Sequence, residues 1–492
     1  MKKLALAVAV PLALIGAATV YTSTQVESTA RDAVDQANIK LREMSAGAGG
    51  EVSVQMLSFE RGLLSSDARY QIDIEAPDDE GNVRQYSVQL TDQLEHGPFP
   101  VSRLTRGRLM PVAAQSHVQL ERTALTEKLF ASASGEIPLV GDVTIGYDGR
   151  QNGELRSAAF NIEDEEGTLR VSPGIITFEA ADDATAFRVD GELKEVDLNL
   201  AGAAGKPVRM SIRGIGMSAD KEEDANGFAL GPSALTVERM DIQAGDAPAV
   251  VIQKASVEEL LGRGERGLDQ TAAYRIGQVE AQGQTFSNVA LAFSLRHLDD
   301  ASLKALVDSY KALLASGPSQ EDAIANMTAA QQNELQAQAV QLLQHKPTFA
   351  LDEFGFETAN GAARLSVVLD LQGPSEDAFT PDAMITSMLA SLKADAGIDK
   401  GVVRDVAGLI AQNKQRGGQL DPAALQQQTD AATDMFSGMT LDTGWFQLQG
   451  DRLASSLHYA DDKVTFNGRD MSVQEFIGFA FGSAQGAGLL GQ

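Results

Sequence analysis

The chain of 492 residues contains no cysteine. This absence excludes disulfides, thiol catalysis, iron–sulfur clusters and cysteine-based zinc sites together. A protein of this length without disulfides has to be held together by its own core. Hydrophobic residues make up 43% of the chain, an ordinary share for a folded protein, so a disordered secreted tail is excluded as well.

Basic residues are scarce. Lysine and arginine number 40 against 68 aspartates and glutamates, which gives a net charge of −28. A nucleic-acid partner is therefore excluded, because a phosphate backbone requires a basic face. Binding to anionic lipid headgroups over a wide surface is disfavoured for the same reason. Solubility is the simplest consequence of the excess acid, and binding of cations or of a basic protein is the alternative.

Sequence motifs of catalysis are also missing. The five histidines lie far apart, at positions 96, 117, 297, 345 and 458, and none belongs to a zinc motif. Gly262 to Gly267 has the spacing of a dinucleotide-binding loop, but a helix-like run from Val257 to Leu261 precedes it instead of a strand. Glu222 to Gly227 resembles the start of a calcium loop, but the twelfth position is Ser233 and not glutamate. We expect no enzyme, no metal and no cofactor.

One long apolar run is present, at the N-terminus. Lys2 and Lys3 precede an uncharged stretch from Leu4 to Tyr21, and the next charge is Glu27. Eighteen helical residues span ~27 Å, which suits either a membrane anchor or a signal peptide cleaved after the small residues 16–18. We expect an uncleaved anchor, because the helical pattern continues beyond it. The lysines place the bulk of the chain in the periplasm, attached to the bacterial inner membrane.

Period-two alternation of apolar residues dominates the rest of the chain. Such alternation predicts antiparallel strands that are buried on one face. Turn signals such as Asp148-Gly149 and Asn226-Gly227 separate the strands, and we expect about twenty of them. The clearest alternating sets begin at Val52, Ala68, Tyr86, Val143, Ile176, Phe187, Val196, Val208, Val289 and Leu365.

Helical patterns lie mainly between residues 300 and 437. Apolar stripes predict helices over 303–314, 320–345, 400–414 and 421–437. Thr380-Pro381 is typical of a helix start, with Leu389 and Leu392 among the inward residues of that helix. Ser472 to Glu475 is a capping box that opens a short C-terminal helix.

The predicted class is α+β: an N-terminal membrane helix and stalk, then predominantly antiparallel β-sheet with an inserted helical region. The expected parts are an anchor or signal segment over 1–24, a helical stalk over 25–46, a β-rich periplasmic region over 47–298, a helix-rich region over 299–440 with a strand pair near 347–372, and C-terminal strands with a short helix over 441–492.

Three segments carry a family resemblance. With the N-terminal apolar run, their order and spacing resemble the YdgA/YihF-like family of bacterial envelope proteins of unknown function. The resemblance implies a membrane-anchored periplasmic protein and no particular reaction. The segments are 58–66 (SFERGLLSS) with 68–70, 96–100 (HGPFP) with Gly107 and Pro111, and 457–459 (LHY) with 464–469 (VTFNGR).

We interpret these motifs as architectural. Both prolines of HGPFP fix φ, so the segment should form a rigid linker in which Phe99 enters the core and His96 makes a structural hydrogen bond. Asn467-Gly468 predicts a type I′ hairpin turn. The motif residues considered, as structural rather than functional, are Arg61, Gly62, His96, Gly97, Pro98, Phe99, Pro100, Asn467 and Gly468.

Two functional hypotheses remain beside an unidentified enzyme, which is the least favoured. In the first, a non-catalytic envelope protein offers a half-apolar sheet to a lipid-like or protein ligand. In the second, the chain is a structural or assembly protein that forms a homodimer. The dimer would use the stalk face, whose residues are Val26, Ala30, Ala33, Val34, Ala37 and Leu41.

Overall fold

A computed structural model describes residues 34, 35, 38, 41, 51–77, 83–164, 167–181, 185–201, 206–314, 320–375, 387–414 and 422–486. The chain divides into two compact units. Unit 1 comprises Met1–Leu235 and Lys304–Leu335, and unit 2 comprises Thr236–Leu303 and Gln336–Gln492. The division passes through strand β12 (Ala229–Ala244), helix α5 (Asp300–Leu314) and helix α7 (Ala329–Gln344), while helix α6 (Gln320–Ala325) falls in unit 1.

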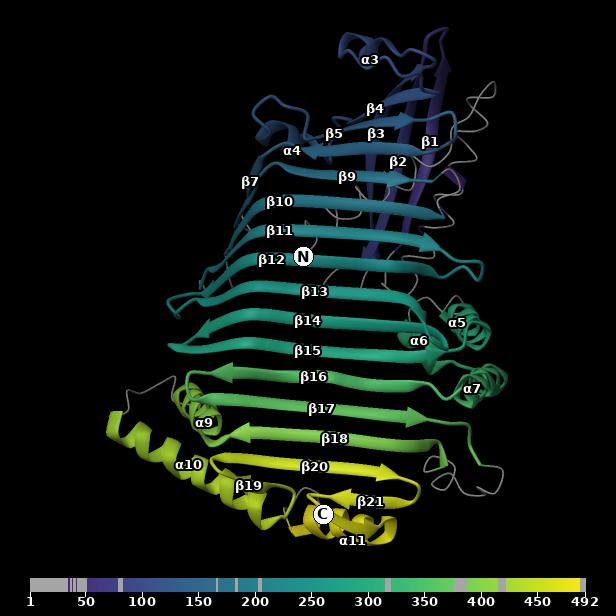
Figure 1. The fold of residues 1–492 in the computed structure, drawn as a ribbon. Coiled ribbons are helices and arrows are strands. Elements are labelled where there is room, and N and C mark those ends of the chain that lie inside the picture. The colour runs from purple at the N-terminus through teal and green to yellow at the C-terminus, as the bar shows by residue number, and fades with distance from the viewer. Residues whose placement is uncertain are drawn as a thin grey trace. The chain divides into compact units, whose positions relative to one another are not determined.

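The strands of unit 1 form an antiparallel sheet. The pairing runs in the order β1, β2, β3, β4, β5, β6, β9, β10, β11, and β8 with β7 pairs along the second half of β10. Figure 1 shows β1 and β2 crossing the direction of β9 to β11. The elements are β1 (Glu51–Arg61), β2 (Ser65–Pro77), β3 (Val83–His96), α3 (Val101–Thr105), β4 (Ala114–Leu120), α4 (Glu127–Ser132), β5 (Leu139–Ile145), β6 (Gln151–Ser157), β7 (Phe160–Asp164), β8 (Gly167–Val171), β9 (Gly174–Ala180), β10 (Ala186–Leu200) and β11 (Val208–Glu223).

The apolar residues that alternate along the strands of unit 1 form one buried core. Val54, Ile72, Leu90 and Val143 are buried in one cluster that extends to Phe178 on β9. The predicted one-sided burial of these strands is confirmed. Each buried leucine or isoleucine side chain contributes roughly 1.5–3 kcal/mol, so this cluster is a main source of stability for a unit without disulfides.

Part of the predicted stalk belongs to this core. Val34 and Leu41 are helical and buried in the cluster. The Asn38 side chain donates to the Val54 carbonyl and accepts from the Val54 N–H, both at 2.8 Å. Two residues of the face predicted to pair with a second copy thus pack on their own chain. Ala33 and Ala37 lie outside the described residues.

The strands of unit 2 are also paired antiparallel. Their pairing runs β13, β14, β15, β16, β17, β18, β20, β21, β22, with β19 beside β20. The elements are β13 (Val250–Gly264), β14 (Gly267–Ala281), β15 (Gln284–Leu298), β16 (Thr348–Thr358), β17 (Gly361–Leu371), β18 (Leu389–Asp399), α9 (Lys400–Lys414), α10 (Pro422–Asp442), β19 (Gln447–Gln449), β20 (Arg452–Ala460), β21 (Lys463–Phe466), β22 (Arg469–Ser472) and α11 (Val473–Gly486).

Most predicted elements are confirmed, and three differ in part. The helix start predicted at Thr380-Pro381 lies outside the described residues. Leu389 and Leu392 belong to strand β18 and not to a helix, because pairing with β17 takes up their backbone groups. Val257 to Leu261 is likewise part of strand β13, and Gly262 to Gly267 spans the tight turn into β14. The segment expected as one helix over 320–345 is divided into α6 and α7.

The predicted anchor, residues 4–21, lies outside the described residues. Within the ranges that the structure describes, no helix is long and apolar enough to cross a membrane.

Candidate functional site

One face of the unit 2 sheet is apolar across six paired strands. Strand pairing places the apolar residues in cross-strand rows. Leu291 of β15 lies opposite Phe354 of β16, which lies opposite Leu365 of β17. Three rows are formed in this way, and together with Tyr274 of β14 we call them the apolar face: Leu291, Phe354, Leu365 and Ala396; Phe293, Leu351, Val367, Ala394 and Leu457; Leu295, Phe349, Leu369, Leu392 and Tyr459.

In the part of the chain that the structure describes, the middle of the apolar face stays partly exposed. Tyr274, Leu291, Phe349 and Phe354 are 36–47% exposed, and most of their neighbours on this face are half-buried. The rings of Tyr274 and Phe293 stack with centroids 6.2 Å apart, which confirms that both point to one side. Five strand spacings of ~4.8 Å make the face about 24 Å wide. An open apolar surface of this extent is typical of a binding site.

The opposite face of the same strands is polar. Lys393 and Asp395 alternate with the apolar residues of β18 and form an ion pair at 3.7 Å. Arg275 of β14 lies 3.7 Å from Glu258 of β13, and Arg296 of β15 lies 3.8 Å from Asp352 of β16. A sheet with one polar and one open apolar face can bind an apolar ligand on one side and remain hydrated on the other.

A carboxylate fixes the register of the strands that carry the apolar face. Asp370 of β17 accepts hydrogen bonds from Ser391 Oγ of β18 at 2.6 Å and from Thr348 Oγ1 of β16 at 2.7 Å. These two bonds lower the pKa of Asp370 below its usual value, the bond from Ser391 having the larger effect. At neutral pH the charged carboxylate therefore joins three neighbouring strands.

The third sequence motif has a structural role in unit 2. Asn467 and Gly468 have φ values of 50° and 77°, as the predicted type I′ turn requires. The Asn467 side chain accepts from the Ser456 N–H at 2.9 Å and donates to the Trp445 carbonyl at 3.2 Å. Trp445 packs against Phe466, with ring centroids 5.6 Å apart. The turn thereby supports the contacts of Trp445 and Phe466 with Phe476 and Phe479 of α11.

The first two motifs meet at one end of unit 1, which we call the tip and define as residues 61–64 and 97–112. The His96 N–H donates to the Leu64 carbonyl at 2.8 Å, and the Ser66 hydroxyl lies 3.0 Å from His96 Nε2. A Cβ on Gly97 would lie 1.9 Å from the Val112 carbonyl oxygen, so only glycine fits there. Figure 1 shows α3 beside the end of β1.

The expectation for Phe99 is wrong. Phe99 is 51% exposed, whereas Pro100 is fully buried and anchors the linker. The Pro100 carbonyl accepts from the N–H groups of Arg103 and Leu104, which starts helix α3 and points Phe99 away from the core. Gly62, whose added Cβ would lie 2.4 Å from the Ser65 carbonyl oxygen, closes the β1–β2 turn beside exposed Arg61.

Ser102 of the tip lies close to a histidine and an aspartate, and the sequence did not single out this group of three. His117 Nδ1 lies 2.5 Å from Asp142 Oδ1, and His117 Nε2 lies 3.1 Å from Ser102 Oγ. The distances are those of a hydrolase triad, but Ser102 donates both its hydroxyl and its N–H to Glu95. In this arrangement the Ser102 hydroxyl is directed to Glu95 and not to His117, unlike the nucleophile of a triad.

A buried carboxyl group supports this cluster from β3. Ser116 Oγ donates to Asp92 at 2.7 Å, and burial raises the pKa of Asp92 above its usual value. The arrangement is a network that joins β3, β4 and β5 at the base of α3. We interpret it as the support of the tip.

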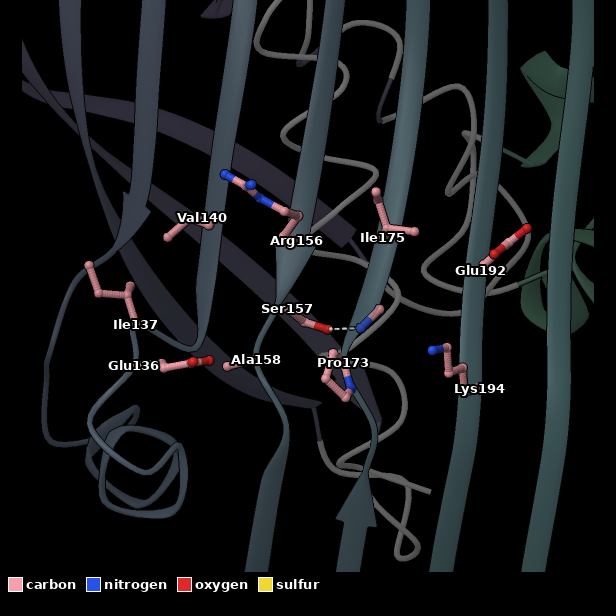
Figure 2. Close-up of a pocket in the computed structure, with 11 residues that line it drawn as sticks. Glu136, Ile137, Val140, Arg156, Ser157, Ala158, Pro173, Ile175, Glu192 and Lys194 are labelled. Atoms are coloured by element: carbon pink, nitrogen blue, oxygen red, sulfur yellow. Dashed lines mark hydrogen bonds between the residues drawn. The ribbon is translucent and has the colours of Figure 1, made fainter. Parts of the chain in front are cut away.

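Unit 1 also has a shallow hollow of about 590 Å³, drawn in Figure 2. Ile137, Val140 and Ile175 line it together with Arg156, which is already paired with Asp142 at 2.9 Å. No motif residue contributes to this hollow, and we assign no ligand to it. Among the described residues no group of three or more histidines or carboxylates is placed to hold a metal ion.

Comparison with known proteins gives a family match. A family model described as a bacterial protein of unknown function, DUF945, matches residues 1–474. The chain is similar to Protein YdgA of Escherichia coli K12, with 24% identity over 93% of this chain and 92% of that protein. It is also similar to the uncharacterized protein YihF of the same organism, with 23% identity over 97% and 98% of the two chains. No solved structure matches.

Proposed function

The chain belongs to the DUF945 family of bacterial proteins of unknown function, and from this premise we propose that it is a non-enzymatic envelope protein that binds the acyl chains of lipids. The apolar face of unit 2 is the observation that carries the proposal. Its rows of leucine, phenylalanine and valine contain no charged side chain. A ligand that fits such a surface is a hydrocarbon chain and not a polar metabolite.

The expected affinity is modest. Half-burial of about 14 methylene groups contributes roughly 5 kcal/mol, at ~0.8 kcal/mol for a fully buried group. Because association has its own free-energy cost, the dissociation constant for one chain should be no tighter than about 0.1 mM. Such binding suits a protein that takes up and releases lipids rather than one that stores them.

The proposed location follows from the N-terminal residues. Leu4 to Tyr21 would hold the chain in the inner membrane, and Lys2 and Lys3 would keep its N-terminus inside, with the two units in the periplasm. Lipids would then be available in the membrane to which the protein is attached. A homodimer remains an expectation, although the burial of Val34 and Leu41 in unit 1 removes part of the stalk face that would form it.

A photoactivatable fatty acid tests the proposal on the full-length protein held in amphipol. After irradiation, mass spectrometry should locate most of the label on β15 to β18. The double substitution Leu291→Asn/Phe354→Asn places two amides in one row of the apolar face and should reduce labelling about tenfold. The matched control, Arg275→Gln/Lys393→Gln on the opposite face, should label like the natural chain.

The fluorescence of Trp445, the single tryptophan and a residue of unit 2, should show unchanged unfolding in both variants. Equal labelling of the natural chain and the Leu291→Asn/Phe354→Asn variant, or labelling spread over both faces, would contradict the proposal.

A further inference from the structure

The tip of unit 1 exposes apolar side chains without a partner in the described residues. These side chains lie on two loops: the β1–β2 turn and the segment around α3. Their exposed fractions run from 51% for Phe99 to 93% for Leu63. The six most exposed side chains are Leu63, Leu64, Phe99, Val101, Leu109 and Met110.

Buried residues and backbone hydrogen bonds hold the longer loop of the tip in place. Pro100 and Val112 are buried and fix both ends of the longer loop. The Gly97 N–H donates to the Ala113 carbonyl at 2.8 Å, and the Val112 N–H donates to the Pro98 carbonyl at 3.0 Å. The fold therefore keeps these large apolar side chains exposed to water. A cluster of exposed apolar side chains is typical of an interaction surface.

The charge of the tip is opposite to that of the whole chain. Residues 96–120 contain no aspartate or glutamate, in a protein whose net charge is −28. Arg61, Arg106 and Arg108 are exposed, and within the part of the chain that the structure describes none of them forms an ion pair. Exposed arginines and exposed leucine, phenylalanine and methionine side chains therefore lie on the same two loops, and Arg106 and Arg108 also line a hollow together with Glu154 and Glu179.

This combination fits a membrane surface with anionic lipids. Apolar side chains enter the boundary between headgroups and acyl chains, while arginines bind phosphate groups. We propose that the tip of unit 1 docks on an anionic bilayer. The inference goes beyond the proposed function and is independent of it, because it uses none of the residues of the apolar face. The charge argument against binding over a wide surface still holds, because the cationic area is local.

Single-cysteine labelling tests the inference, since the natural chain has no cysteine. The full-length variants Leu63→Cys and Leu109→Cys, each with the environment-sensitive dye NBD, are held in amphipol and mixed with vesicles of phosphatidylcholine containing 30% phosphatidylglycerol. The emission should increase at least twofold, and doxyl-labelled lipid should quench it. Tyr147→Cys, an exposed site of unit 1 outside the tip, is the control and should not respond.

A second set of variants separates the contribution of the arginines to membrane binding from that of the apolar side chains. Arg61→Gln/Arg106→Gln/Arg108→Gln should weaken vesicle binding about tenfold at low salt and leave little salt dependence. Phosphatidylcholine vesicles without the anionic lipid should give a similarly weak response with the natural arginines. Membrane insertion of residues 4–21 cannot produce this pattern, because the dyes report only their own positions.

The inference is overturned if doxyl lipid fails to quench the dyes, or if Tyr147→Cys responds as the tip variants do. It is also overturned if emission increases with protein concentration in the absence of vesicles, because the tip would then bind a second copy. An increase on addition of an unfolded polypeptide, with no response to vesicles, would assign the tip to a protein partner.

Discussion

The hydrogen bonds of Asp370 predict how the stability of unit 2 depends on pH. Asp370→Asn keeps the shape of the side chain but removes the negative charge that receives two hydroxyl donors. Hydrogen bonds to a charged group contribute ~1.5–3 kcal/mol each. An amide can retain one of the two donors, and the carboxylate is partly hydrated, so we expect a loss of about 2 kcal/mol in the free energy of unfolding at pH 7.

The sign of the pH dependence follows from the direction of the pKa shift. The bonds from Ser391 and Thr348 lower the pKa of Asp370 in the folded protein below the value of 3.8. The stabilisation is therefore complete above the unfolded pKa and is lost as pH falls through the folded pKa. The difference between the natural chain and Asp370→Asn should stay constant from pH 7 to pH 5 and should decrease below about pH 4.

Urea unfolding followed by Trp445 fluorescence measures this difference in unit 2. The matched control is Asp395→Asn, an exposed carboxylate on the neighbouring strand whose ion pair with Lys393 at 3.7 Å should contribute under ~0.5 kcal/mol. Equal losses in the two variants, or a loss for Asp370→Asn that persists at pH 3, would refute the role given to Asp370.

Two further predictions concern the sequence motifs. Gly97→Ala should displace the loop at the tip, because its Cβ would lie 1.9 Å from the Val112 carbonyl oxygen, and trypsin should then cut faster after Arg106. The control Gly107→Ala has open space around its Cβ. It should lower the free energy of unfolding by only about 1 kcal/mol and leave the rate of proteolysis unchanged. Asn467→Ala should destabilise unit 2 by about 2 kcal/mol and shift Trp445 emission to the red, because two hydrogen bonds are lost. Asn467→Gly should be milder, since glycine tolerates the positive φ, and an equal effect of both substitutions would contradict this explanation.

The sequence was sufficient to predict the strands because their alternation is local. Every second residue of Val289 to Leu295 is apolar, and this pattern remains visible whichever strand pairs with β15. The pattern was ambiguous at Leu389 and Leu392, whose spacing also fits a helix face. The two leucines form a strand because they pair with β17, and the local sequence does not indicate this pairing.

The candidate sites depended on contacts that one sequence does not reveal. His117 and Asp142 are 25 positions apart and meet only because β4 and β5 place them directly opposite each other. Phe99 is a large apolar residue, and only the loop geometry around Pro100 shows that it points into water. Alternation likewise predicted a half-apolar sheet in unit 2 but could not show that Phe349 and Phe354 on its apolar face stay exposed.

Native mass spectrometry of the full chain, extracted gently from bacterial membranes, tests the central claim most directly. The binding of acyl chains to the apolar face predicts protein ions that carry the mass of a phospholipid or fatty acid. These ions should be lost in Leu291→Asn/Phe354→Asn and kept in Arg275→Gln/Lys393→Gln. Protein ions without lipid, or lipid retained equally by both variants, would contradict the claim.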